Sequence, residues 1–129
     1  MILDASAVIA ILRDEPDAPR FHLAVAIAEQ RRISAATHLE AAVVIDAERD
    51  PIASRKLDDL MQRIGAEIVT FTASQGNLAR AAYRDYGKGS GHPARLNFGD
   101  CFAYALAKEL GEPLLFKGDD FSKTDVERA

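Results

Sequence analysis

The sequence predicts a three-layer α/β fold in which helices cover both faces of a mainly parallel sheet. Short apolar runs alternate along the chain with longer segments whose apolar residues recur every three or four positions. Four strands interleaved with helices are typical of such a sheet, because parallel neighbours need crossover connections. No repeat, linker or change of composition divides the 129 residues. We therefore expect one domain over residues 1–129.

Local signals define the elements of the first third of the chain. Residues 2–4 form an apolar strand that leads into a helix over residues 7–12. Pro16, which follows two acidic residues, indicates the start of a second helix, because proline is favoured at the first helical position. Residues 32–35 predict the second strand.

The next two helices begin with recognisable capping signals. Thr37 and Glu40 have the Thr-x-x-Glu spacing of a capping box, in which each side chain bonds a free amide of the first turn. The apolar run 39–48 continues from there as a helix. A proline directly after Asp50 begins another helix, over residues 51–64, whose apolar residues recur at helical spacing.

The second half of the chain continues the alternation. Its elements are a strand over residues 67–71, helices over residues 72–86 and 98–110, and a strand over residues 114–116. Thr72 and Gln75 repeat the capping-box spacing. Gly111 ends the last helix, since glycine tolerates the left-handed conformation that follows many helices. Residues 87–95 are glycine-rich and basic, which predicts a loop.

Carboxylates stand where the predicted elements begin or end. Asp4 closes the first strand, Glu40 and Asp100 lie in first turns of helices, and Asp119 and Asp120 follow the last strand. The carboxyl ends of parallel strands gather at one edge of the sheet, where ligand chemistry occurs. An empty acidic pocket at that edge would be destabilised by repulsion, whereas a hard divalent cation would be held by its oxygens. The pattern predicts a metal site.

Most of these acids also have a structural explanation. Glu40 serves equally well as half of a capping box, and Asp100 as the third helical residue behind an Asn97 cap. The acids after the last strand lie in a loop, where solvated carboxylates are common. Asp4 is harder to explain in this way, because Ser6 is available to cap the helix that follows. The joint pattern therefore carries the prediction, rather than any single position.

Composition bounds the function without deciding it. The net charge of −4 and the pI of about 5.3 count mildly against a nucleic-acid binder, although two bound Mg²⁺ ions would add +4 and bring the charge to zero. A single cysteine, Cys101, excludes an internal disulfide, and the three histidines lack the spacing of a zinc site. We see no signal peptide and no membrane span, so we expect a cytoplasmic protein.

Four segments together resemble one known family. They are Ile2–Ala7, Ser34–Glu40, Leu96–Ala107 and Leu114–Asp125. These segments resemble the PIN-domain ribonucleases, specifically the VapC toxins of bacterial type II toxin–antitoxin modules. The resemblance spans residues 2–125 and implies a PIN-like α/β/α domain with a four- to five-stranded sheet. It also implies an endoribonuclease that depends on Mg²⁺, with Mn²⁺ as a substitute.

The resemblance implies roles for the acidic positions. The expected catalytic residues are Asp4, Glu40, Asp100, Asp119 and Asp120. Asp4, Glu40, Asp100 and one acid of the last pair, with Asp119 as the candidate, are expected to hold the metal. Which of those last two acids completes the site stays open. Ser6 and Asn97 are expected to support the ligands. The metal would activate a water that attacks the phosphodiester, leaving 5′-phosphate and 3′-hydroxyl ends.

The resemblance also implies partners. Single-stranded or looped RNA is the expected substrate, and the cations expected to bind it are Arg13, Lys88, Arg95 and Lys117. A cognate VapB-type antitoxin is expected to insert a basic side chain among the acids and to lay apolar side chains on the early helices, along Ala7, Val8, Ile11 and Leu12. We also expect a homodimer and a toxin–antitoxin hetero-oligomer.

Three other functions deserve comparison with this hypothesis. A catalytically silent PIN-fold interaction module would keep the fold without the activity. A phosphoacceptor receiver domain needs an acidic pair after the first strand, and only Asp4 stands there. A haloacid-dehalogenase-type phosphatase needs Asp-x-Asp, but Ser6 occupies the second position. The first alternative is separated from the enzyme by an RNA cleavage assay with and without Mg²⁺.

Overall fold

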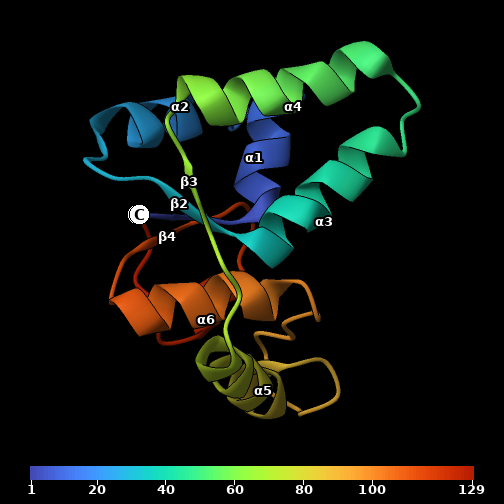
Figure 1. Cartoon of the computed structure of the whole chain (residues 1–129). Coiled ribbons are helices and arrows are strands. Elements are labelled where there is room, and N and C mark those ends of the chain that lie inside the picture. The colour runs from blue at the N-terminus through green and yellow to red at the C-terminus, as the bar shows by residue number, and fades with distance from the viewer.

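The computed structural model describes all 129 residues and contains one parallel sheet with the strand order β3-β2-β1-β4 (Figure 1). The strands are β1 (Ile2–Leu3), β2 (Arg32–Ser34), β3 (Glu67–Val69) and β4 (Leu114–Leu115). The helices are α1 (Ala5–Leu12), α2 (Ala18–Ile27), α3 (Ala35–Asp46), α4 (Pro51–Arg63), α5 (Ala73–Tyr86), α6 (Asp100–Leu110) and the 3₁₀ helix η1 (Phe121–Lys123). The predicted α/β fold is confirmed. None of these helices has the length and apolar character needed to cross a bilayer.

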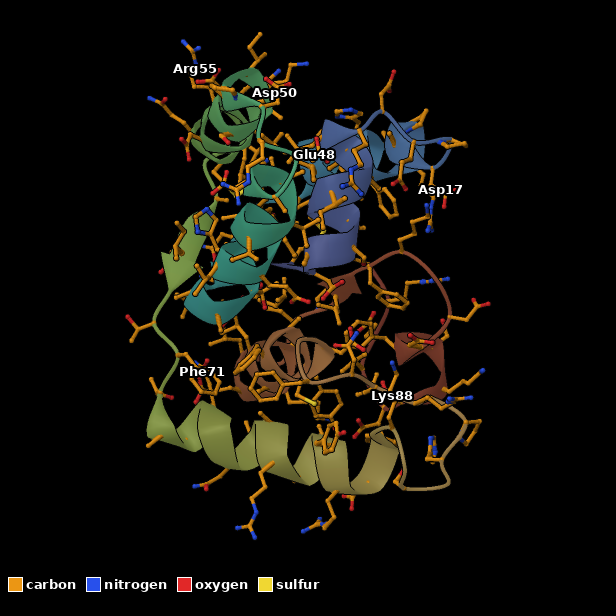
Figure 2. All side chains as sticks on the ribbon, turned by 90° about the vertical axis from the view of Figure 1, so that its right-hand side faces the viewer. Asp17, Glu48, Asp50, Arg55, Phe71 and Lys88 are labelled. Carbon is orange, nitrogen blue, oxygen red and sulfur yellow. The ribbon has the colours of Figure 1, made fainter.

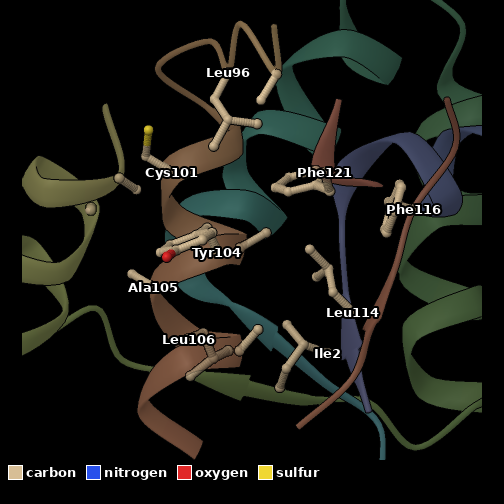
Figure 3. Close-up of a cluster of buried hydrophobic side chains, with 14 residues drawn as sticks. Ile2, Leu96, Cys101, Tyr104, Ala105, Leu106, Leu114, Phe116 and Phe121 are labelled. Atoms are coloured by element: carbon tan, nitrogen blue, oxygen red, sulfur yellow. The ribbon is translucent and has the colours of Figure 1, made fainter. Parts of the chain in front are cut away.

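Helices cover both faces of the sheet, α1 to α4 on one face and α5 and α6 on the other (Figure 1). The strands supply side chains to the two faces alternately, as the extended backbone requires. Ile2 and Leu114 are buried in the core beside α5 and α6 (Figure 3), whereas Leu3 and Leu115 are buried in the core beside α1 to α4. A two-residue strand thus serves both cores.

The order of the strands creates a switch point beside β1. The chain proceeds outward from β1 through β2 to β3, and then returns to place β4 on the other side of β1. Ile2 therefore pairs with Arg32 on one side and with Leu114 on the other. In open α/β sheets, ligands bind at the carboxyl ends of the strands where the order reverses. Figure 2 looks onto this edge, which faces right in Figure 1.

The second helix begins later than predicted. α2 starts at Ala18, with Asp17 at the N-cap and Pro19 in the first turn, so Pro16 does not begin a helix. Asp14, just after α1, has a φ of 49°, and a turn in which the Ala18 N–H donates to the Glu15 carbonyl at 2.8 Å precedes α2. A residue in the left-handed region cannot continue into a right-handed helix, and the turn needs several residues before α2 can start.

The capping box predicted at Thr37 is wrong. β2 ends at Ser34, whose hydroxyl accepts a hydrogen bond from the Ala36 N–H at 3.3 Å, so α3 starts before Thr37. Thr37 lies inside the helix with its hydroxyl buried and unpaired. Glu40 is the sixth residue of α3 and caps nothing. Helix capping therefore does not explain the presence of Glu40 at this position.

Other terminal signals are confirmed. Thr72 caps α5 by accepting from the Gln75 N–H at 3.2 Å, and Asp50 caps α4 by accepting from the Ile52 N–H at 2.9 Å. Gly111 ends α6 with a φ of 62°, the left-handed conformation that glycine adopts at little cost.

The apolar surface predicted on the early helices is wrong. Ala7, Val8 and Ile11 belong to the core beneath α1, with at most 9% of each residue exposed. Only Leu12 of that set is partly exposed. The helix packs both against α3 and against α2, so its apolar side chains are already covered within the chain. A partner cannot use them.

Candidate active site

Asp4 is buried at the carboxyl end of β1, with 3% of the residue exposed. Its carboxylate accepts hydrogen bonds from the backbone N–H of Ser6, at 2.9 Å, and from the Ser6 hydroxyl. Asp4 rather than Ser6 is thus the N-cap of α1, which corrects the sequence-based assignment. The Ser6 hydroxyl in turn accepts from the Lys117 N–H at 3.0 Å, just beyond β4. Ser6 therefore joins the two strand ends that flank the switch point.

Asp100 is held at the start of α6 by a reciprocal pair of hydrogen bonds with Asn97. The Asn97 side-chain oxygen accepts from the Asp100 N–H at 2.9 Å, and the Asp100 carboxylate accepts from the Asn97 N–H at 2.7 Å. Each side chain thus satisfies a backbone donor of the helix start, as in a capping box. The expected support of Asp100 by Asn97 is present in the geometry.

Glu40 reaches the same place from α3. It is half-buried, and its carboxyl group lies against Gly99, the residue before Asp100. A Cβ atom built on Gly99 would lie 2.3 Å from Glu40 Oε1, so only a glycine leaves room for the side chain as it stands. The contact between α3 and the start of α6 thereby brings Glu40 beside Asp100.

The carboxylates behave as one electrostatic group. Burial raises the pKa of Asp100 to about 7, the Asn97 N–H opposes this rise, and repulsion from Asp4, Asp120 and Glu40 adds to it. Burial and repulsion from Asp4 raise the pKa of Glu40. Burial also raises the pKa of Asp4, against the hydrogen bonds from Ser6. We call Asp4, Glu40, Asp100 and Asp120 the acidic cluster.

The structure separates the two acids after β4. Both are exposed, and they follow Gly118, which has a φ of 89°. Asp120 raises the pKa of Asp100, whereas Asp119 has no such effect. The expectation that Asp119 holds a metal stays a prediction, and Asp120 is the acid that interacts with the cluster.

The chemistry of the cluster suits a hard divalent cation. As they stand, no three acidic, histidine or cysteine side chains converge closely enough to hold a metal ion. The oxygens are engaged instead with Ser6, with Asn97 and against Gly99. The donors are nevertheless all carboxylate oxygens, the ligands that Mg²⁺ and Mn²⁺ prefer. Burial is the main cause of the raised pKa of Asp100, repulsion from the other carboxylates adds to it, and a bound cation would relieve that repulsion.

Comparison with known proteins identifies the family. A family model described as "PIN domain" matches residues 1–127. The chain belongs to the PIN-domain family. The predicted resemblance is thereby confirmed, and the receiver-domain and phosphatase alternatives lose their basis.

Relatives of this PIN domain match over its full length. It is 56% identical over 129 residues to "VapC ribonuclease Mb0625" of Mycobacterium bovis, covering 100% of this chain and 97% of that protein. It is 51% identical over 126 residues to "Ribonuclease VapC30" of Mycobacterium tuberculosis, covering 98% and 95%.

Solved structures share the fold of this PIN domain at low identity. One is the crystal structure of Mycobacterium tuberculosis VapC20, described as a sarcin–ricin loop cleaving toxin, with a TM-score of 0.77, 14% identity, and coverage of 99% of this chain and 97% of that one. Another is a toxin–antitoxin complex from Klebsiella pneumoniae, with a TM-score of 0.70, 16% identity, and coverage of 94% and 89%.

The cations expected to bind RNA differ in availability on this PIN domain. Arg13 donates two hydrogen bonds to Glu48, at 3.0 and 2.6 Å, and Lys117 forms an ion pair with Glu15. Lys88 and Arg95 are exposed in the 87–95 loop and form no ion pair. Figure 2 shows Lys88 near the end of α5, on the side of the molecule that the carboxyl ends of the strands face. Two of the four cations are therefore already partnered by acids within the chain.

Sequence reasoning missed Gly99. A weak signal was available, because glycine is often found where another group approaches the backbone closely. What could not be inferred was the approaching group, since Glu40 lies far away in the chain and meets Gly99 only through the packing of α3 against α6.

Proposed function

We propose that this PIN domain is the toxin of a type II toxin–antitoxin module and hydrolyses RNA at the acidic cluster. The observation that supports the proposal is the electrostatic interaction among four carboxylates, which come from four separate segments at the carboxyl edge of the sheet. The names of the full-length relatives support the substrate class. Carboxylates gathered in this way can hold divalent cations, which neutralise the negative charge that develops on a phosphodiester during cleavage.

The proposed site holds Mg²⁺, or Mn²⁺ in its place, through Asp4, Glu40, Asp100 and Asp120. A bound ion of this kind lowers the pKa of water and neutralises charge on the phosphodiester. Glu40 is the candidate acceptor of the proton of the attacking water, because burial and the Asp4 charge make its carboxylate more basic. Ser6 and Asn97 orient their carboxylate partners by donating to them.

The proposed substrate is single-stranded or looped RNA. Its backbone can bend toward an acid pocket at a sheet edge, which a regular duplex cannot do as readily. Lys88 and Arg95 are the two of the four candidate cations that are exposed and form no ion pair, and we expect them to contact flanking phosphates. The expected products carry 5′-phosphate and 3′-hydroxyl ends.

The proposed antitoxin uses two surfaces. Its basic side chain pairs with the acidic cluster, whose charges lack a cationic partner. Its apolar segment packs on α2, where Leu23 and Ile27 are 63% and 75% exposed on one helix face, four residues apart. The α2 surface takes the place of the surface predicted on α1, whose apolar side chains are buried. An Ile27→Asp variant that still binds its genomic neighbour with unchanged affinity would contradict this placement.

We also propose a homodimer formed through the groove between α5 and α6. This groove has a volume of about 530 Å³ and is lined by aromatic rings, among them Phe71, Phe98 and Phe102. Phe71 is labelled in Figure 2. Phe98 is 75% exposed, and monomers rarely leave large apolar patches uncovered. Phe98→Asp should convert a dimer to a monomer in light scattering. A wild-type chain that is monomeric at high concentration would contradict the proposal.

One experiment tests the enzymatic proposal. Purified protein is incubated with cellular RNA in Mg²⁺, in excess EDTA, and as Asp4→Asn. We expect cleavage only by the wild type with Mg²⁺, because the variant keeps the shape and capping ability of the side chain but lacks its charge. Cleavage that persists in EDTA would refute metal dependence. A folded wild type without any activity would favour the catalytically silent interaction module.

A further inference from the structure

We propose that Gly99 is a positioning residue for Glu40, because its missing side chain leaves the space that the Glu40 carboxyl group occupies beside Asp100. The inference rests on the proposed function, in which Glu40 serves the acidic cluster. A Cβ atom built on Gly99 would lie 2.3 Å from Oε1, 2.6 Å from Cδ and 2.6 Å from Oε2 of Glu40. All three distances are below the 3.0 Å that real Cβ atoms respect, so the whole carboxyl group would have to move.

The backbone does not require a glycine at this position. Gly99 has φ −63° and ψ −40°, the ordinary right-handed helical conformation, which alanine adopts more readily than glycine. Gly111 and Gly118, by contrast, have φ values of 62° and 89° that favour glycine for conformational reasons. The feature that distinguishes Gly99 is therefore the contact with Glu40.

The contact decides where the α3 carboxylate lies relative to α6. Asp100 is fixed by Asn97 on its own helix start, whereas Glu40 must approach from a different helix. Over Gly99 it can lie along the amino end of α6, where the partial positive charge of the helix favours an anion. A methyl group there would displace the end of a flexible side chain rather than the backbone, so the fold should survive while the cluster is rearranged.

The matched experiment compares Gly99→Ala with Gly76→Ala. Gly76 lies in α5, and a Cβ there would meet the Phe71 ring at 3.8 and 3.9 Å, an ordinary contact. We expect Gly99→Ala to lose about tenfold or more in Mn²⁺ affinity, measured by calorimetry, and in RNA cleavage, at an unchanged or higher melting temperature. Gly76→Ala should keep both. Wild-type Mn²⁺ affinity and cleavage in folded Gly99→Ala would overturn the inference.

A double-mutant cycle tests whether the effect passes through Glu40. Glu40→Gln should itself weaken Mn²⁺ binding, and adding Gly99→Ala to it should cause little further loss, because the carboxylate that the methyl displaces is already gone. Losses that add fully would overturn the inference, since they would show an effect of Gly99 that is independent of Glu40.

Crystal structures of the metal-free wild type and Gly99→Ala separate this inference from the proposed function. A Glu40 carboxyl group that keeps its place in Gly99→Ala would overturn the positioning role, whatever the activity. A wild type that binds no Mn²⁺ and cleaves no RNA would instead overturn the proposed function. The position of Glu40 over Gly99 would then have no role in metal binding or cleavage. A displaced carboxyl group together with lost Mn²⁺ affinity supports both.

Discussion

The carboxylate of Asp4 accepts both the backbone N–H and the hydroxyl of Ser6. This relationship gives one aspartate two tasks, because it caps α1 and also belongs to the buried acidic cluster. The same hydroxyl accepts from the Lys117 N–H, so the two strand ends at the switch point are tied through a single oxygen. The same hydrogen bonds therefore hold the ends of β1 and β4 together and position the Asp4 carboxylate.

Removing the Ser6 hydroxyl should destabilise the fold. Ser6→Ala leaves the buried Asp4 carboxylate with one donor fewer and the Lys117 N–H without its acceptor. A hydrogen bond to a charged group is worth about 1.5–3 kcal/mol, so we expect a loss of that size in urea unfolding at neutral pH. Ser6→Thr, which keeps the hydroxyl, is the control. Equal stability of Ser6→Ala and wild type would show that the bond contributes nothing.

The two acids after β4 should differ in importance. Asp120→Asn removes a charge that acts on Asp100, and we expect it to reduce RNA cleavage and Mn²⁺ affinity by at least about tenfold, the range typical of groups that support a metal site. Asp119→Asn should retain most of both, because its carboxylate has no comparable effect on the cluster. The reverse order of activities in a side-by-side assay would assign the role to Asp119.

Stability of the metal-free chain should fall as pH rises through the weakly acidic range. Asp100 has a pKa of about 7 in the folded chain against an ordinary value of 3.8, so the folded state binds the extra proton between these values. The free energy of unfolding decreases with rising pH wherever the folded state binds more protons than the unfolded state. The loss of stability is therefore expected between pH 3.8 and about 7. Burial shifts the pKa of Asp4 and Glu40 in the same direction.

The measurement for this prediction is urea unfolding in EDTA at a series of pH values. In Asp100→Asn the slope between pH 4 and 7 should flatten, because the titrating group is absent while its shape is kept. A wild-type stability that rises steadily across this interval would contradict the strained state of the cluster.

Divalent cations should reverse the repulsion. Mg²⁺ or Mn²⁺ that binds only the folded state should raise the melting temperature, and at about 100-fold over the dissociation constant the gain is roughly 2.7 kcal/mol. Asp100→Asn should respond much less to the same addition. A melting temperature that does not change on addition of Mg²⁺ or Mn²⁺ at pH 7.5, where the carboxylates are charged, would argue against a metal site.

The sequence by itself determined the features that depend on neighbouring residues. Alternating apolar runs predicted the parallel sheet, and the local chemistry of Asp50 and Gly111 predicted where helices begin and end. The positions of Asp4 and Asp100 beside predicted element ends sufficed to propose one acidic site, because parallel strands deliver their carboxyl ends to a common edge. These inferences hold because capping and periodicity are short-range effects.

Only the tertiary structure decided which distant groups meet. Glu40 was ambiguous as long as Thr37 could be a cap, and the end of β2 at Ser34 removed that ambiguity. The space that Gly99 leaves for the Glu40 carboxyl group depends on how α3 packs against α6. That Asp120, and not Asp119, raises the pKa of Asp100 depends on the path of the loop after β4. Helix packing and loop direction place side chains far apart in the chain within a few ångströms, and no local pattern encodes those distances.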